Sequence, residues 1–196
     1  MVSGIILAAG ESRRMGRAKQ LLPLGGATML QRAVQNLLAS RLGEVILVLG
    51  HRAGAIRPLF RSYPVKVVLN RRYREGMSTS IIAGVLATRE DSDAFLIALG
   101  DQPLIGPQVV NILLQAQGES SKGIVVPAFR GQPGHPVLFH RRYRQELLRL
   151  TGDVGARAVL EAHPDDLVTV EVETEAVLQD IDRWEDYQRL LVEGAR

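Results

Sequence analysis

The chain opens with residues that can bind an anion: an apolar strand that breaks into a loop of small and cationic side chains. Val2 to Ala8 is apolar almost throughout, which indicates a strand buried on both faces. Gly10 and Gly16 allow positive φ and the close approach of a ligand, and backbone N–H groups in such a loop can converge on a phosphate. Four cations within seven positions favour a polyphosphate ligand, and these are Arg13, Arg14, Arg17 and Lys19.

The alternative interpretation of this stretch is a solvated basic loop after a core strand. It is not a Walker A loop, because no Gly-Lys-Ser/Thr closes it, and it does not match the dinucleotide-binding G-x-G-x-x-G pattern.

A carboxylate at the end of the most apolar segment is the best single candidate for a metal ligand. That segment, residues 94–99, stops at Gly100-Asp101-Gln102-Pro103. A carboxylate at the end of a buried strand is costly unless it meets a cation or hydrogen-bond donors, so Asp101 requires a partner. The alternative role for Asp101 is to cap a turn.

A third polar stretch, residues 70–80, leads into apolar residues at helical spacing. Ser78 can cap that helix, and a loop of small residues at a helix N-terminus suits an anion or an amide. The alternative is that Ser78 and Ser80 only cap the helix and that Asn70 only forms a turn.

The first stretch has the pattern Leu7-Ala8-Ala9-Gly10-x-Ser12-x-Arg14-Met15-Gly16-x-x-Lys19-x-Leu21-Leu22-Pro23. It resembles the signature of the nucleotidyltransferases that share the fold of the molybdenum-cofactor guanylyl- and cytidylyltransferases. The resemblance implies a Rossmann-like domain that binds a nucleoside triphosphate and transfers its nucleoside monophosphate to a phosphate acceptor. It implies catalytic roles for Lys19, Arg14 and Asp101.

The same resemblance extends to later motifs. Gly100-Asp101-x-Pro103 is similar to the element whose aspartate holds Mg²⁺ against the triphosphate, and Asp182 in Asp180-x-Asp182 corresponds to the second metal ligand. Arg183-Trp184 depart from the Thr-Pro that follows in the family. Asn70-x5-Gly76-x-Ser78-x-Ser80 resembles the element beside the nucleobase and ribose. The nucleotide-binding residues so implied are Leu7, Ala8, Ala9, Gly10, Arg14, Lys19, Asn70, Gly76, Ser78 and Ser80.

Two motifs resemble the cytidylyltransferase branch on the acceptor side. Gly131-x-x-Gly134-His135-Pro136 implies a contact from His135 to a phosphate, although a backbone carbonyl could equally hold this ring. Gly152-Asp153-x-Gly155-Ala156-Arg157 implies an acceptor contact for Arg157, whereas Asp153 is expected to cap its own helix. Guanylyl-transferring relatives carry glycine at the position of Ala9, so the resemblance favours CTP.

Strands alternate with helices along the chain, which predicts right-handed crossovers and a mainly parallel sheet. With the resemblance, this predicts an α/β fold: a Rossmann-like three-layer sandwich of the nucleotide-diphospho-sugar transferase type, with a small hairpin insertion. Ligands in such sheets collect beyond the carboxyl ends of the strands, which places Ala9, Gly50 and Asn70 on one rim. Residues 128–139 are predicted to form the hairpin over that rim. The expected strands are 2–8, 45–49, 65–69, 94–99, 123–127 and 167–172, and the expected helices are 28–40, 52–61, 106–117, 141–150 and 158–162, with one more starting near Ser78. Thr28 and Gln31 are expected to form a capping box at the start of the first helix, and Pro107 is expected at the first position of the helix at 106–117.

Length and composition predict one globular domain, 1–196, with an NTP-binding half (1–105) and an acceptor-binding half (106–196). The absence of cysteine excludes disulfides, thiolate metal sites and a cysteine nucleophile. No apolar window reaches membrane-span length and no signal peptide is seen, so we expect a cytoplasmic protein without a membrane partner. With 5% aromatic residues and no known nucleic-acid module, nucleic-acid binding is not expected.

These features favour Mg²⁺-dependent transfer of CMP from CTP to the terminal phosphate of molybdopterin (molybdenum) cofactor, which releases pyrophosphate. A molybdoenzyme of the hydroxylase type is the possible recipient of the product. The alternatives are a guanylyltransferase, another nucleotidyltransferase with a different phosphate acceptor, and a non-catalytic carrier or chaperone of the cofactor.

Overall fold

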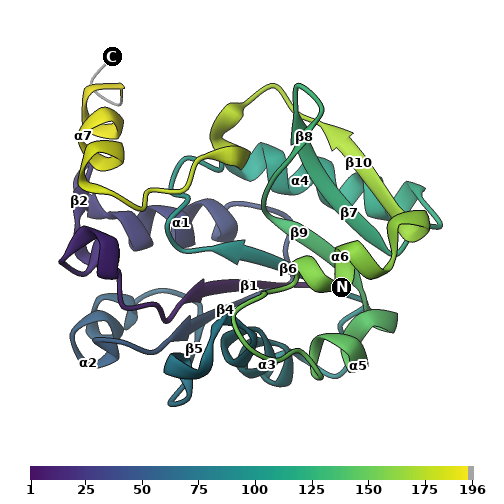
Figure 1. Ribbon diagram of the computed structural model, residues 1–196, viewed down its shortest axis with the longest axis horizontal. Coiled ribbons are helices and arrows are strands. Elements are labelled where there is room, and N and C mark those ends of the chain that lie inside the picture. Colours follow the sequence, from purple (N-terminus) through teal and green to yellow (C-terminus); the bar gives the residue numbers. More distant parts are fainter. Residues whose placement is uncertain (194–196) are drawn as a thin grey trace.

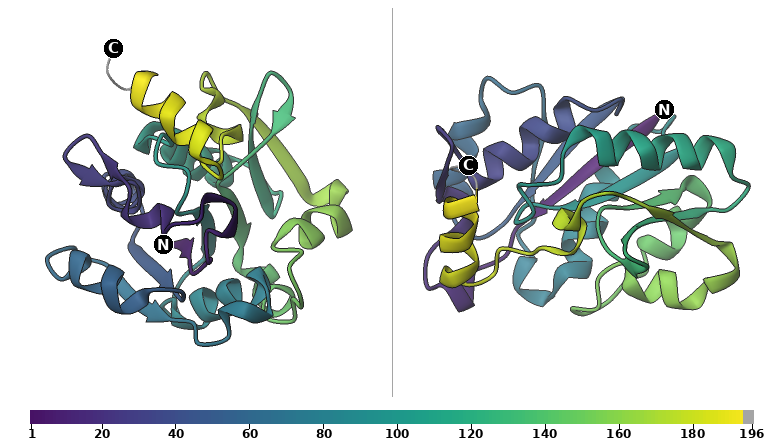
Figure 2. Two further views of the ribbon diagram at one scale, coloured as in Figure 1. Left: turned by 60° about the vertical axis from the view of Figure 1, so that its left-hand side comes forward. Right: turned by 90° about the horizontal axis from the view of Figure 1, so that it is seen from above.

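The computed structural model describes residues 1–193, which form a mixed sheet with helices on both faces (Figures 1 and 2). The strand order is β10-β7-β9-β6-β1-β4-β5, with β8 paired to β7, and β2 and β3 form a separate ribbon. The strands are β1 (Val2–Ala8), β2 (Pro23–Leu24), β3 (Ala27–Thr28), β4 (Glu44–Leu49), β5 (Lys66–Leu69), β6 (Ala94–Leu99), β7 (Ile124–Phe129), β8 (Gln132–Pro133), β9 (Val137–His140) and β10 (Leu167–Glu171).

The helices are α1 (Met29–Leu38), α2 (Ala53–Ile56), α3 (Met77–Ala87), α4 (Pro107–Glu119), α5 (Arg144–Leu147), α6 (Arg157–Ala162) and α7 (Trp184–Glu193). Within residues 1–193, none of them is long and apolar enough to cross a membrane.

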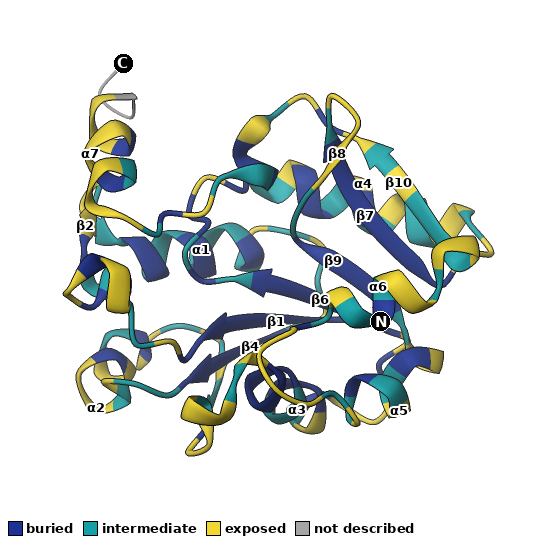
Figure 3. Cartoon of the chain, viewed as in Figure 1, coloured by how far each residue is buried: buried dark blue, intermediate teal, exposed yellow. Residues whose placement is uncertain are grey.

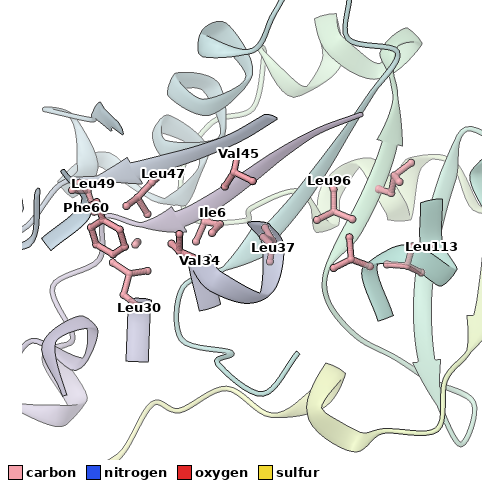
Figure 4. Packing of buried hydrophobic residues seen from close by; sticks show 14 of the residues in the cluster. Ile6, Leu30, Val34, Leu37, Val45, Leu47, Leu49, Phe60, Leu96 and Leu113 are labelled. Atoms are coloured by element: carbon pink, nitrogen blue, oxygen red, sulfur yellow. The ribbon is translucent and has the colours of Figure 1, made fainter. Parts of the chain in front are cut away.

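The sheet is mostly parallel, as predicted. β1 pairs in parallel with β4 and β6, β4 with β5, and β7 with β10, while β9 runs antiparallel to both β6 and β7. Alternate side chains of β1 enter two different cores, because successive side chains of a strand point to opposite faces. Ile6 belongs to one core with Val34 of α1 and Leu113 of α4 (Figure 4), and Ile5 belongs to the other core with Ile81 of α3. The central strands β1, β4, β6, β7 and β9 are therefore buried between two helical layers, whereas β5, β8 and β10 are more exposed (Figure 3).

Short sequence motifs predicted the starts of two helices correctly. Thr28 and Gln31 form the predicted capping box of α1, in which the Thr28 hydroxyl accepts from the Gln31 N–H and the Gln31 side chain accepts from the Thr28 N–H. Pro107 occupies the first turn of α4, again as predicted.

Two predicted helices are shorter than expected. The helix expected at 52–61 is the single turn α2 followed by a 3₁₀ turn, Arg57–Phe60, because Pro58 has no N–H to continue α-helical bonding. The helix expected at 141–150 is a 3₁₀ turn, Arg141–Tyr143, followed by α5.

The predicted placement of the 128–139 hairpin over the rim is wrong. Its returning strand, β9, lies inside the sheet between β6 and β7, and only the short β8 pairs back onto β7. Val137, Leu138 and Phe139 are consecutive and all buried, which requires cover on both faces of the strand. A rim position would have exposed one of these faces to water.

Candidate active site

A cleft of about 650 Å³ opens beyond the carboxyl ends of β1 and β6, on the rim where the sequence places the ligand. It is lined by residues 7–14, 19–20, 73–77, 80, 99–101, 153, 180 and 182. Backbone bonds hold its floor: the Gly100 N–H donates to the Leu7 carbonyl (2.9 Å) and the His51 N–H donates to the Ala9 carbonyl (3.0 Å). The loop after β1 is thus attached to the ends of both neighbouring strands.

Lys19 lies at the centre of a partly buried ion-pair cluster. Its ammonium donates to Asp101 Oδ2 and to Asp182 Oδ1, the latter at 2.7 Å, and Arg14 Nη1 donates to Asp182 Oδ2 at 2.7 Å. The Lys19 and Asp101 side chains are only 14% and 18% exposed. The structure therefore brings together the three residues predicted to be catalytic and both predicted metal ligands.

The ion pairs of this cluster stabilise the charged forms of Lys19 and Asp182. Burial alone would lower the pKa of Lys19, but the charges and hydrogen bonds of Asp101 and Asp182 outweigh it and raise that pKa. Burial acts to raise the pKa of Asp182, but Lys19 and Arg14 lower it overall. Asp180, next to them, has a raised pKa because of burial and the nearby Asp101 charge. Lys19 and Asp182 thus stay charged at neutral pH.

The donor set fits a divalent cation. Asp101 Oδ1 is buried and has no hydrogen-bond partner among the described residues, so this oxygen has an unused lone pair for a ligand. No group of three or more His, Cys, Asp or Glu side chains within residues 1–193 is arranged to hold a metal unaided. Carboxylates combined with phosphate oxygens of a substrate are the usual ligands of Mg²⁺ in enzymes that use nucleoside triphosphates. Asp101 and Asp182 can therefore hold such an ion together with a substrate.

The other predicted nucleotide-binding residues divide into two groups. Leu7, Ala8, Ala9, Gly10, Gly76 and Ser80 line the cleft, together with Arg14 and Lys19. Asn70 and Ser78 do not line it. The Asn70 amide donates to Thr79 Oγ1 (2.8 Å) and Ser80 Oγ (2.9 Å), and its Oδ1 accepts from the Arg72 N–H (2.9 Å), so Asn70 fixes the start of α3 from beneath.

Capping by Ser78 is a prediction that the structure corrects, because α3 begins at Met77 after Gly76. Ser78 is only 1% exposed, and its N–H donates to the carbonyl of Gly152 (3.2 Å). The cap comes from Asp153, whose Oδ1 accepts from the Met77 N–H (3.1 Å). Asp153 therefore caps α3, 76 positions away, and does not cap its own helix, which begins only at residue 157.

We expect Asp153→Ala to lower the free energy of unfolding by about 1 kcal/mol, the usual effect of losing an N-cap, and the melting temperature by about 2–4 °C. Asp153→Asn is the matched control, because an amide oxygen can accept the same hydrogen bond. Thermal denaturation of both variants measures the difference. An equal loss in Asp153→Asn would show that charge, and not capping, carries the effect.

The two predicted acceptor residues lie outside the cleft lining. The His135 N–H donates to the Val177 carbonyl (2.9 Å), and burial lowers the pKa of its imidazole although the charges of Asp180 and Asp101 oppose this. Arg157 is exposed at the start of α6, where its Nε donates to Glu161 at 2.8 Å. His135 thus lies near enough to Asp101 and Asp180 to be affected by their charges, whereas the structure does not bring Arg157 together with the Lys19 cluster.

Two glutamines that sequence reasoning did not select support the site. Gln20 is buried, and its Nε2 donates to the Gly10 carbonyl (3.1 Å), which holds the loop. Gln102 Nε2 donates to Asp180 Oδ1 (2.8 Å), which connects the end of β6 with the segment that precedes α7. The only feature of the sequence that could have indicated their role is that each directly follows a predicted site residue, Lys19 or Asp101.

Residues 4–167 match the MobA-like NTP transferase domain family. Nicotine blue oxidoreductase of Paenarthrobacter nicotinovorans is 31% identical, over 97% of this chain and 96% of that protein. Molybdenum cofactor cytidylyltransferase of Escherichia coli K12 is 28% identical, over 93% and 92%. A solved manganese complex of Rv0371c from Mycobacterium tuberculosis H37Rv is 28% identical with a TM-score of 0.83, covering 97% of this chain and 98% of that one, and shares the Rossmann-like mixed sheet. This chain therefore belongs to the MobA-like NTP transferase family and is a nucleotidyltransferase.

Proposed function

We propose that this protein transfers CMP from CTP to the terminal phosphate of molybdopterin (molybdenum) cofactor and releases pyrophosphate. The observation that carries the transfer chemistry is the Lys19 ammonium between Asp101 and Asp182, in a cleft whose floor is the loop after β1. The similarity to a molybdenum cofactor cytidylyltransferase over nearly the whole chain supports the acceptor and the base.

The residues of the cleft suit an in-line displacement at the α-phosphate. Lys19 and Arg14 supply two cations that can neutralise charge on the α-phosphate and on the departing pyrophosphate. No side chain needs to form a covalent intermediate, because the acceptor phosphate is itself the nucleophile. Asp101 and Asp182 would hold Mg²⁺, which supplies charge neutralisation and orients the triphosphate when bound.

In this proposal, residues 1–105 bind the nucleotide and residues 106–196 bind the acceptor, with His135 and Arg157 as acceptor contacts. Asn70 and Ser78 then act on the nucleotide by positioning α3, while Gly76 and Ser80 face it directly. We place the protein in the cytoplasm with a molybdoenzyme of the hydroxylase type as recipient, and with no membrane or nucleic-acid partner.

Pyrophosphate release from CTP, GTP, ATP and UTP, each with Mg²⁺ and with or without molybdenum cofactor, tests the proposal. We expect release with CTP only when the cofactor is present. Preference for GTP would indicate a guanylyltransferase, and release only with another phosphate acceptor would indicate a different transferase of the family. Tight binding of the cofactor without release from any nucleotide would indicate a carrier.

The choice of base depends on Ala9, whose methyl group is buried at the base of the cleft against Gly50. A Cβ on Gly50 would lie 2.8 Å from that methyl carbon, so Ala9 packs closely against the Gly50 backbone. One such group changes selectivity by about 10- to 200-fold, and a purine needs more space than a pyrimidine. We expect the wild-type protein to favour CTP and Ala9→Gly to relax this preference.

Competition between CTP and GTP for the same acceptor measures the ratio of kcat/KM values. Ala8→Gly is the matched control, since it removes one methyl group from the adjacent residue, at the end of β1. An equal loss of the CTP preference in both variants would show that added backbone freedom causes the effect. Equal use of the two nucleotides by the wild-type protein would refute the role of Ala9.

A further inference from the structure

Within the described residues, all four cations that line the cleft are paired with carboxylates of the same cleft. Lys19 and Arg14 contact Asp101 and Asp182, as described above. The other two contact Glu11: Arg13 Nε donates to Glu11 Oε2 at 2.6 Å and Arg74 Nε donates to Glu11 Oε1 at 3.1 Å. A polyphosphate that approaches any of these cations therefore meets a carboxylate that is already paired with it.

The Glu11 pairs differ from the Lys19 cluster in position and exposure. Glu11 belongs to the loop after β1, whereas Arg74 lies 63 positions away in a 3₁₀ turn, Tyr73–Glu75, after β5. Their ion pair joins the two loops that flank the cleft. The Glu11 side chain is 20% exposed, while those of Arg74 and Arg13 are 73% and 81% exposed. The two guanidinium groups therefore lie at the mouth, and the carboxylate lies beneath them.

The pairing leaves most of each guanidinium unused. A guanidinium has five N–H donors in a planar fork that matches phosphate oxygens, and Glu11 accepts one from each arginine. A phosphate carries more negative charge than one carboxylate and can accept bidentate bonds, so it competes well for both groups. The arginines lower the pKa of Glu11, which keeps this competitor ionised at neutral pH.

We propose that Arg74 and Arg13 bind the outer phosphates of the nucleoside triphosphate. In the free protein Glu11 pairs with both arginines, and the triphosphate replaces Glu11 when it binds. This inference rests on the proposed function for the presence of a triphosphate, and it assigns new residues to that ligand. Lys19, whose side chain is only 14% exposed, lies deeper, and together with Arg14 it remains for the α-phosphate. Glu11 then weakens nucleotide binding while it keeps the two loops in place for it.

The affinity of the full-length protein for inorganic tripolyphosphate and for CTP, measured by calorimetry with Mg²⁺, tests this exchange. Glu11→Gln should tighten both affinities by about two- to fivefold, as expected for the removal of an exposed competing ion pair. Arg74→Gln should weaken them by about tenfold, as expected for the loss of a charge-assisted hydrogen bond. In the double variant, the gain from Glu11→Gln should shrink, because one of its two partners is absent.

Two controls change charge by the same amount without touching these pairs. Glu75 also lines the cleft but pairs with Arg72, so Glu75→Gln reports the general effect of one fewer negative charge. Arg71→Gln removes an exposed cation of the same loop that does not line the cleft. The proposal is overturned if Glu11→Gln binds tripolyphosphate no tighter than Glu75→Gln, or if Arg74→Gln binds it as well as Arg71→Gln.

The tripolyphosphate measurement separates this proposal from the proposed function. The predicted pattern with tripolyphosphate supports the role of Glu11 and Arg74 even if no transfer from CTP to any acceptor occurs. Normal transfer from CTP, combined with an unchanged tripolyphosphate affinity in Glu11→Gln, refutes the exchange alone.

Discussion

Asp101→Asn will abolish nucleotide transfer and leave the fold intact. Asp101 follows β6, and one of its oxygens accepts from Lys19 while the other is buried without a partner among residues 1–193. An amide has nearly the same shape but no charge, so it is a poor ligand for Mg²⁺ and a poor partner for an ammonium. We expect Mg²⁺-dependent pyrophosphate release to fall by about three orders of magnitude or more, the upper end of the loss for one electrostatic contact.

Asp153→Asn is the matched control, since it makes the same chemical change in the same cleft and is expected to keep most of the activity. Circular dichroism and the melting temperature establish that both variants are folded. Near-normal Mg²⁺-dependent activity in Asp101→Asn, or in Asp182→Ala, would show that these carboxylates do not hold the metal.

Lys19→Met will lower kcat by about two orders of magnitude or more, the typical loss for one electrostatic contact to a transition state. Methionine has a similar length without the charge, so the variant removes the cation and fills its space. We expect the effect on kcat and not only on KM, because negative charge on the bridging oxygen grows as the bond to pyrophosphate breaks. Steady-state kinetics with CTP and acceptor measure both parameters. A change confined to KM would show that Lys19 supplies uniform binding.

Metal binding gives this variant a second readout that does not depend on turnover. The Lys19 ammonium lies between the two carboxylates that would hold the metal, so it competes with a divalent cation when no nucleotide is bound. Lys19→Met should therefore bind Mn²⁺ alone more tightly than the wild-type protein, as measured by electron paramagnetic resonance. Arg17→Met is the control, because Arg17 stacks on Trp184 at 4.7 Å and does not line the cleft. Equal Mn²⁺ affinities in all three proteins would contradict the competition.

The sequence alone determined the features that depend on neighbours along the chain. The apolar run of β1 predicted a strand buried on both faces, and Gly16 has the positive φ that was expected of a glycine in the loop, because both properties depend on adjacent residues. The capping box of Thr28 and Gln31 spans three positions and was predicted for the same reason. The position of Asp101 on the binding rim followed from strand polarity in a parallel sheet, a rule that holds for any member of this architecture.

Only the tertiary structure decided which distant residues meet. Lys19 reaches Asp101 across 82 positions and Asp182 across 163, Asp153 caps α3 across 76, and Glu11 meets Arg74 across 63. β9 enters the sheet between β6 and β7 because its consecutive apolar residues need cover on both faces, a demand that periodicity alone does not assign to a neighbour. Such contacts arise from packing the whole sheet, since the free energy of each depends on elements that come together only in the folded chain.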